Sequence, residues 1–358
     1  MRAPSRRQTL AVLTIAAAST ACAPPPPPPP PPQPIVIGPP TDTVKIPLTD
    51  LLAQTYYSNV GGIYPDAVNQ PPADHDSAAR ARRNSIKPLD VNGDESPFGK
   101  YVLLSIGGSS TTQAWCSARS SPPCAGWTFM GKAAADPSIN HYTMVIVNGA
   151  ADSLDAPAWT SAASPAYERI KVARLAPLGL SENQVQAAWI DLSDPKPAAS
   201  LPADSADAYT LLANLGQVMR AMRLRYPNLR LVFVSSRVYG GYATVDLSGE
   251  PYAYETGFSV KWLIDSQIRE VRGQQNNPRA GTLDYTRKMS PLILWGPYLW
   301  ANGVVPRSDG LLWDRVDFEQ DGVNPSQNGE SKIAGLLIEF FKTSPYTRCW
   351  FLVNQYCL

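Results

Sequence analysis

Five short apolar runs organise the chain from residue 101 onward. They cover residues 102–106, 143–147, 185–190, 229–234 and 292–295, with polar or loop-rich stretches between them. Runs of this length that are apolar on both faces are typical of parallel strands buried between two layers. The pattern therefore predicts one sheet of five buried strands.

Three longer segments carry apolar residues at helical spacing instead. In residues 208–226, leucine, valine and methionine side chains recur every three or four positions until Pro227 stops the helix. Similar spacing predicts helices over residues 258–272 and 326–342. Because strands and helices alternate, we expect right-handed crossovers, with functional groups at the carboxyl ends of the strands.

Residues 1–22 have the features of an export signal. Arginines precede an apolar stretch over residues 10–18 that is too short to span a bilayer. Residues 5–10 resemble a twin-arginine signal, and residues 19–22 resemble a lipoprotein cleavage site that ends at Cys22. We therefore expect an exported, periplasmic or cell-surface protein, either lipid-anchored at Cys22 or cleaved and released.

The next segments divide the chain further. Residues 23–40 contain an unbroken proline run at 24–32. Since proline has no amide hydrogen, this segment predicts a polyproline II linker of about 30 Å. Residues 41–100 predict an irregular collar with one short amphipathic piece at 46–57. A main domain over residues 101–348 and a tail over 349–358 complete the expected organisation.

Composition narrows the function classes. Hydrophobic residues make up 44% of the 358 residues and charged residues 17%, which suits a globular protein with a large core. The formal net charge of +1 gives no reason to expect a nucleic-acid partner. Contact with a membrane is expected only through a lipid anchor at Cys22.

Four cysteines follow Cys22, and an exported protein can oxidise them. Cys116/Cys124 and Cys349/Cys357 have the same short separation, which makes two local disulfides the simplest arrangement. Four cysteines allow three pairings, and free buried thiols are the other alternative. Paired cysteines and only two histidines leave few metal ligands, so no metal site is predicted.

A glycine- and serine-rich turn follows the first apolar run. Residues 105–113 read Ser-Ile-Gly-Gly-Ser-Ser-Thr-Thr-Gln, with Ser109 after two glycines. A serine at such a strand-to-helix turn can present its hydroxyl at the sheet edge beside backbone amides that stabilise an oxyanion. The same residues are also common in tight turns and helix caps. A phosphate loop would need a Gly-Lys-Ser/Thr ending, which is missing here.

Residues 321–326 read Asp-Gly-Val-Asn-Pro-Ser and lead into the last predicted helix. Together with Gly107, Gly108 and Ser109 they resemble the SGNH, or GDSL-type, hydrolases. That family places Gly-x-Ser after its first strand and Asp-x-x-His-Pro before a terminal helix. Both blocks match in kind and order, except that Asn324 stands where the family has histidine.

The resemblance covers roughly residues 45–350. Segments 235–242, 250–255 and 295–300 are similar to those of uncharacterised exported bacterial members of this superfamily. The resemblance implies a three-layer α/β sandwich with a five-stranded parallel sheet in flavodoxin-like order and loop-rich insertions. It also implies Ser109 as nucleophile and Asp321 as orienting carboxylate, with no cofactor.

The departure at Asn324 bears on turnover. An asparagine amide cannot accept a proton near neutral pH, so slow or absent hydrolysis is expected. Of the two histidines, His141 precedes the second strand at the wrong edge of a parallel sheet, and His75 lies in the loop-rich segment. His75 is expected to be exposed, although a loop of that length could fold over the site. Asp321 with an ordinary pKa would be a poor base for a hydroxyl.

The resemblance further implies oxyanion donors after the second and third strands. Gly149 is the expected donor after the second strand, with Asn148 beside it. After the third strand, Asp194 stands where the family has asparagine, and a carboxylate there would repel an oxyanion.

Aromatic residues gather in the loops, where they either stack on sugar rings or pack a loop-rich shell. They are Tyr239, Tyr242, Tyr252, Tyr254, Trp295, Tyr298 and Trp300.

The sequence leaves two functions open. One is a serine acyl-ester hydrolase that acts on a small-molecule or glycan ester with weakened turnover. The other is a non-catalytic ligand- or carbohydrate-binding protein that retains the pocket.

Overall fold

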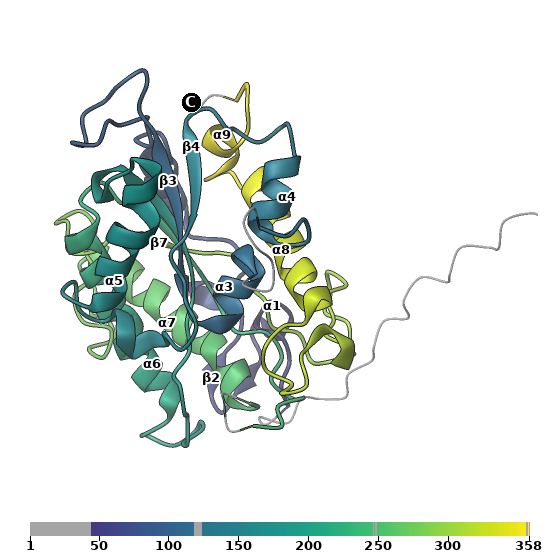
Figure 1. Ribbon diagram of the computed structural model, residues 1–358. Helices are drawn as coiled ribbons and strands as arrows, with labels where there is room; N and C mark the ends of the chain where they lie inside the picture. The colour runs from purple at the N-terminus through teal and green to yellow at the C-terminus, as the bar shows by residue number, and fades with distance from the viewer. Residues whose placement is uncertain (1–43, 118–123, 246, 248, 356, 358) are drawn as a thin grey trace, which may run out of the picture. The chain divides into compact units, whose positions relative to one another are not determined.

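A parallel sheet forms the centre of the fold in the computed structural model (Figure 1). The structure describes residues 44–117, 124–245, 247, 249–355 and 357, so the expected signal, the proline linker and Cys22 lie outside the described residues. The strands of the sheet are β3 (Tyr101–Gly107), β4 (Met144–Asn148), β5 (Val185–Asp191), β6 (Leu231–Ser235) and β7 (Leu292–Trp295). Each predicted run forms one of these strands.

The strand order is β4-β3-β5-β6-β7, and every neighbouring pair is parallel. This is the flavodoxin-like order that was expected, with β3 at the second position and its carboxyl end at a topological switch point. Ligands of open α/β sheets bind at such a point. The fold therefore places the turn after β3 where a site is expected.

Helices cover both faces of the sheet (Figure 1). The first face carries α5 (Pro165–Ile170), α6 (Asp207–Arg225) and α7 (Tyr252–Val271). The second carries α2 (Ala73–Arg83), α3 (Ser109–Cys116), α4 (Phe129–Ala135), α8 (Gln327–Thr343) and α9 (Arg348–Phe351). The three long helices predicted from periodicity are α6, α7 and α8, and α7 begins at Tyr252, earlier than its periodicity indicated.

Two hydrophobic cores follow from the alternation of side chains along each strand. In β5, Ala188 and Ile190 belong to the core beneath α6 and α7, whereas Ala187 and Trp189 belong to the core beneath α3 and α8. Because every strand contributes to both cores, the sheet is buried on both faces. This burial explains why the strands read as continuous apolar runs.

The segment before the sheet is more regular than expected. It contains α1 (Leu48–Leu51), a short antiparallel pair β1 (Thr55–Tyr56) and β2 (Asn59–Val60), and the helix α2. Only His75, Ala79 and Arg83 of α2 are buried, so this polar helix has no apolar stripe that periodicity could detect.

Both predicted disulfides are present. Cys116 is bonded to Cys124 and Cys349 to Cys357. The first closes the chain just beyond α3, and the second ties the end of the chain to α9. Among the described residues, no helix is both long and apolar enough to cross a membrane.

Candidate functional site

A polar cavity of about 170 Å³ lies where the turns after several strands meet. Its lining comes from the β3–α3 turn, from the loops after β4, β5 and β6, and from the loop before α8. We call it the Ser109 cavity; its described lining residues are Gly108, Ser109, Ser110, Thr111, Ser153, Asp155, Asp191, Ser193, Asp194, Pro195, Arg237, Leu247, Val323 and Asn324. Ser109 and Asn324, which are 215 positions apart in sequence, therefore share one cavity.

Ser109 is the first residue of α3, and Gly108 is the cap before it. The first amides of a helix have no acceptor within the helix, so they can stabilise negative charge near this serine. Thr111, in the first turn of α3, donates a 2.8 Å hydrogen bond from its Oγ1 to the Asp191 carbonyl at the end of β5. The start of α3 is thus tied to the neighbouring strand.

Val323 and Asn324 line the cavity from a compact loop that also contains Asp321. The Asn324 amide donates a 2.6 Å hydrogen bond to Asp321 Oδ2, and the backbone amides of Val323 and Asn324 donate to Oδ1, each at 2.9 Å. Burial works to raise the pKa of Asp321, but these three hydrogen bonds outweigh it and hold the pKa below its ordinary value. Asp321 thus orients residue 324 and is a weaker base than an ordinary aspartate.

Gly322 allows this loop to close. Its φ of +69° lies in the left-handed region, and an added Cβ would stand 1.8 Å from the Tyr242 carbonyl oxygen. Gly322→Ala is expected to lower the free energy of unfolding by about 2 kcal/mol or more, because backbone strain and a backbone clash add together. Urea denaturation checks this against Gly310→Ala, where φ is +87° but the space is open. Equal losses in the two variants would show that the clash with Tyr242 is absent.

Neither histidine lines the cavity. The expectation that His75 is exposed is wrong: its side chain is 3% exposed in α2, and its Nε2 donates to the Ile293 carbonyl at 2.9 Å. Burial lowers the pKa of His75, which keeps the ring neutral. His141 is exposed before β4, as expected, with Nε2 3.1 Å from the Asp136 carbonyl oxygen.

The three expected oxyanion residues lie in different places. Asp194 lines the Ser109 cavity, and burial raises its pKa to about 6, against a hydrogen bond from the Asn214 amide. Asn148 and Gly149 are not among the residues that line it. The Asn148 amide instead donates to Thr112 Oγ1 at 2.8 Å, which ties α3 to β4. An oxyanion role for these residues stays a prediction.

Three cavity residues were missed from the sequence: Asp155, Asp191 and Arg237. Burial raises the pKa of Asp191 to about 7 and also raises the pKa of Asp155, while Arg237 opposes both shifts. Arg237 forms no ion pair with any described residue, and its Nη1 donates only a long 3.4 Å hydrogen bond to Ser110 Oγ. A carboxylate that directly follows an apolar run, as Asp191 follows residues 185–190, is the signal that could have drawn attention.

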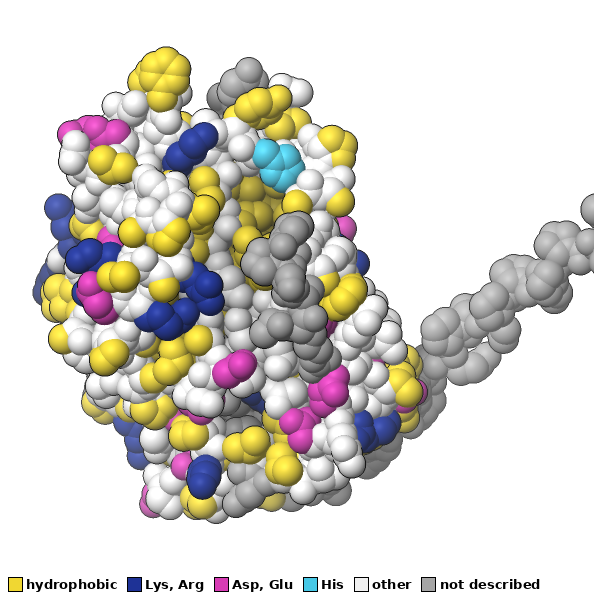
Figure 2. All heavy atoms as spheres, viewed as in Figure 1, with side chains coloured by type: hydrophobic (Ala, Val, Ile, Leu, Met, Phe, Trp, Pro, Cys, Tyr) yellow, Lys and Arg dark blue, Asp and Glu magenta, His cyan; other side chains and the backbone are white. Residues whose placement is uncertain are grey.

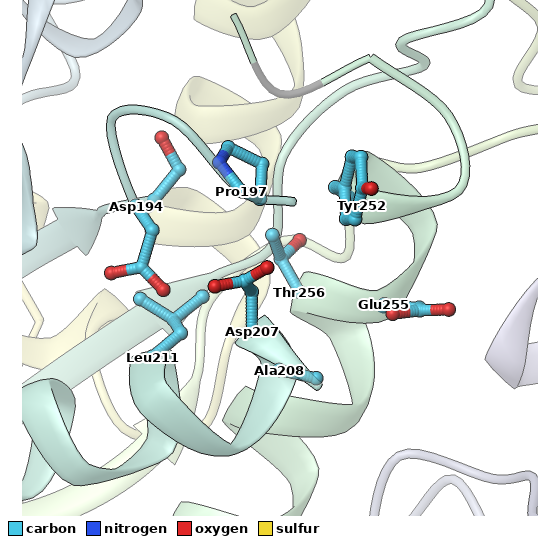
Figure 3. Close-up of a pocket in the computed structure, with 9 residues that line it drawn as sticks. Asp194, Pro197, Asp207, Ala208, Leu211, Tyr252, Glu255 and Thr256 are labelled. Carbon is cyan, nitrogen blue, oxygen red and sulfur yellow. The ribbon is translucent and has the colours of Figure 1, made fainter. Parts of the chain in front are cut away.

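A second, smaller cavity adjoins the first and shares Ser193 and Asp194 with it (Figure 3). In Figure 3 the carboxyl groups of Asp194 and Asp207 lie on one side, whereas that of Glu255 points away from both. Asp207 accepts two backbone amides of the loop after β5, and Glu255 accepts the Leu201 amide and the Tyr56 hydroxyl. These two acids hold the loop in place.

Three of the aromatic residues expected in loops lie in regular elements instead, Tyr252 and Tyr254 in α7 and Trp295 at the end of β7. Most of the group packs the protein interior. Tyr254, Trp295, Tyr298 and Trp300 are each no more than 5% exposed. None of the seven aromatic residues singled out in the sequence lines the Ser109 cavity, although Tyr252 borders the smaller one. The packing alternative is therefore confirmed for these four buried rings.

Charged side chains of both signs share the visible surface (Figure 2). Basic and acidic side chains lie in small groups on this face. Within the described ranges, no group of three or more His, Cys, Asp or Glu side chains is placed to hold a metal ion.

Comparison with known proteins gives structural likeness at low sequence identity. No protein-family model matches the chain, and no curated protein matches it. Solved structures that it resembles include an extracellular lipase from Streptomyces rimosus, with 14% identity over 67% of this chain and 99% of that one and a TM-score of 0.30. Another is a putative GDSL-like lipase from Parabacteroides merdae, with 15% identity over 71% and 97% of the two chains and a TM-score of 0.34.

A third is a salicylyl-acyltransferase from a tetracycline biosynthetic pathway. It is 13% identical over 71% of this chain and 58% of that one, with a TM-score of 0.35. At these identities and scores, the likeness carries no conclusion about activity.

Proposed function

We propose that this protein is an SGNH-type serine ester hydrolase in which Ser109 is the nucleophile. The observation that carries the proposal is that Ser109 and Asn324 line one cavity at the carboxyl ends of parallel strands. Asp321 supports residue 324 from behind through the 2.6 Å hydrogen bond. This is the spatial order of nucleophile, second residue and orienting carboxylate that a serine triad needs.

Asn324 sets the rate that this arrangement can reach. Its amide is a hydrogen-bond donor toward Asp321 and cannot take the Ser109 proton. It can still position a substrate carbonyl or a water molecule in the cavity. Hydrolysis that depended on residue 324 as base would therefore be slow.

The lining favours a polar ester. Carboxyl, hydroxyl, amide and guanidinium groups surround Ser109, and Leu247 and Val323 supply apolar contact. Hydroxyl-rich ligands such as acylated glycans offer matching hydrogen-bond partners, so we include them in the proposed substrate class. Export to the periplasm or cell surface is part of the proposal, supported by the two disulfides.

The second candidate is a binding protein that keeps the cavity without turnover. The observation that favours it is the replacement of the expected base by Asn324, which leaves the pocket and its polar lining intact. Such a protein would hold a small-molecule or glycan ester and release it unchanged.

An esterase assay separates the two functions. Purified protein and Asn324→His are incubated with p-nitrophenyl acetate at pH 8, and nitrophenolate release is followed. Saturable turnover by the unaltered protein, above that of heat-denatured protein, is the expected result. Turnover that appears only in Asn324→His would favour the binding protein. No turnover in either would remove the ester-hydrolase proposal.

A further inference from the structure

We propose that Asp191 is the general base of this site and accepts the Ser109 proton in place of the missing histidine. The inference rests on the proposed function and names a further catalytic residue for it. Asp191 and Ser109 line the same cavity, and Asp191 is the last residue of the strand next to β3.

The sheet register brings the two residues together. Asp191 in β5 pairs with Gly107 in β3, two positions before Ser109. Residues 187 and 189 belong to the core beneath α3, so alternation puts the Asp191 side chain on that same face of the sheet. Thr111 Oγ1, in the first turn of α3, is bonded to the Asp191 carbonyl. Strand pairing and this bond together fix Asp191 beside the start of α3.

One oxygen of the Asp191 carboxyl group is unpartnered among the described residues. Asp191 is 6% exposed, and its Oδ1 is buried without a hydrogen-bond partner among the described residues. A buried polar oxygen left without a donor costs stability, so such groups call for an explanation. A carboxylate that receives a proton during turnover is one explanation.

Arg237 is the charged group that acts on Asp191, and three further acids lie in or near the cavity. Arg237, after β6, lowers its pKa, and burial raises it further than Arg237 lowers it, to about 7. Asp155, after β4, and Asp194, after β5, line the same cavity. Asp321, before α8, lies behind Asn324. A base whose pKa lies near 7 is matched to proton transfer at neutral pH.

In this proposal, Asp191 accepts and returns one proton in each half of the reaction. The Ser109 Oγ–acyl bond forms as its proton moves to an Asp191 carboxyl oxygen, directly or through one water molecule. The bond from acyl carbon to leaving oxygen then breaks, and the same proton passes to that oxygen. Water next attacks the acyl-enzyme and gives a proton to Asp191, which returns it to Ser109 as the acid leaves.

The other acids in or near the cavity fit this role less well. Asp194 already accepts the Asn214 amide at 3.0 Å, and Asp321 accepts three hydrogen bonds that weaken it as a base. Asp155 is the nearest competitor, since a Cβ built at Gly108 would lie 3.4 Å from its Oδ1. Asp155 is less buried than Asp191, and the first turn of α3 is bonded to the backbone carbonyl of Asp191.

The test is the pH dependence of kcat/KM for p-nitrophenyl acetate between pH 5 and pH 9. The unaltered protein is expected to show a rise to a plateau with its midpoint near pH 7. Asp191→Asn is expected to lower the plateau by about 100-fold and to remove the rise, because general base catalysis contributes at least that much. Adding Asn324→His to Asp191→Asn is expected to recover about 10-fold or more, since an imidazole restores a base.

The matched control is Asp152→Asn, an exposed residue of the loop after β4 that does not line the cavity. It removes one negative charge nearby and is expected to leave the profile unchanged. Circular dichroism melts establish that each variant is folded. Because the profile of the unaltered protein needs no substitution, the proposal stays testable even if a variant is unstable.

The outcomes are distinct. Turnover that requires Ser109 but is unchanged in Asp191→Asn overturns the inference and leaves the proposed function standing. A rise of kcat/KM with pH that disappears in Asp155→Asn and persists in Asp191→Asn also overturns the inference. That result would assign Asp155 as the general base. Activity that falls as pH rises through 7 overturns it as well, because Asp191 would then act as a protonated donor. No Ser109-dependent turnover in any variant would end the proposed function itself.

Discussion

Replacing Ser109 with alanine is expected to lower kcat/KM for p-nitrophenyl acetate by about 10³-fold or more, because no acyl-enzyme can form. Binding of the substrate should change little, since the hydroxyl is one polar group among many in the cavity. The measurement is steady-state turnover at pH 8, together with the pre-steady-state burst of nitrophenolate that an acyl-enzyme produces.

The control for this experiment is Ser85→Ala, an exposed serine beyond the end of α2. It should retain full turnover and the burst. If Ser109→Ala retained them as well, the observed hydrolysis would come from another residue, and the nucleophile would be misassigned.

Replacing Asp191 with asparagine is expected to change how stability depends on pH. Burial raises the pKa of Asp191 to about 7 in the folded chain, so the folded state binds its proton more tightly than the unfolded state. The contribution of Asp191 to the unfolding free energy is therefore highest at low pH. It falls as pH rises from the pKa of the unfolded chain to about 7. Between pH 5 and pH 8 the loss should be about 2.5 kcal/mol of unfolding free energy.

The asparagine side chain in the Asp191→Asn variant does not titrate in this pH range, so the variant should not show this loss of unfolding free energy. Urea denaturation at pH 5 and pH 8 measures the difference in unfolding free energy between the unaltered protein and the variant. Relative to the variant, the unaltered protein should be less stable at pH 8 than at pH 5. Other titrating acids, such as Asp194 and Glu255, affect both proteins alike and cancel. A difference that is the same at both pH values would mean that Asp191 titrates normally.

Much of the fold could be predicted because burial leaves a pattern in the sequence. The five strands are buried on both faces, and each therefore reads as a short apolar run. Helix α2 could not be found in this way, since it buries one histidine, one alanine and one arginine rather than an apolar stripe. Its packing depends on contacts with distant segments, such as the bond from His75 to Ile293.

The candidate site was predictable in part for a related reason. Ser109 and the loop of Asp321 and Asn324 follow from motif order, because the carboxyl ends of parallel strands meet at one edge. Asp155, Asp191 and Arg237 belong to no motif, and aspartate is common at strand ends as an ordinary cap. Their meeting in one cavity depends on how segments at the ends of three strands fold together, which no local pattern records.

If Ser109 is the nucleophile of an active cavity, covalent labelling should find it. The protein is incubated with a fluorophosphonate ester at pH 8, digested, and its peptides are mapped by mass spectrometry. We expect one stoichiometric phosphonyl adduct on Ser109, and we expect it to form more slowly at pH 5. An adduct on a different serine, or an unmodified Ser109 in folded protein after prolonged incubation, would contradict the nucleophile assignment.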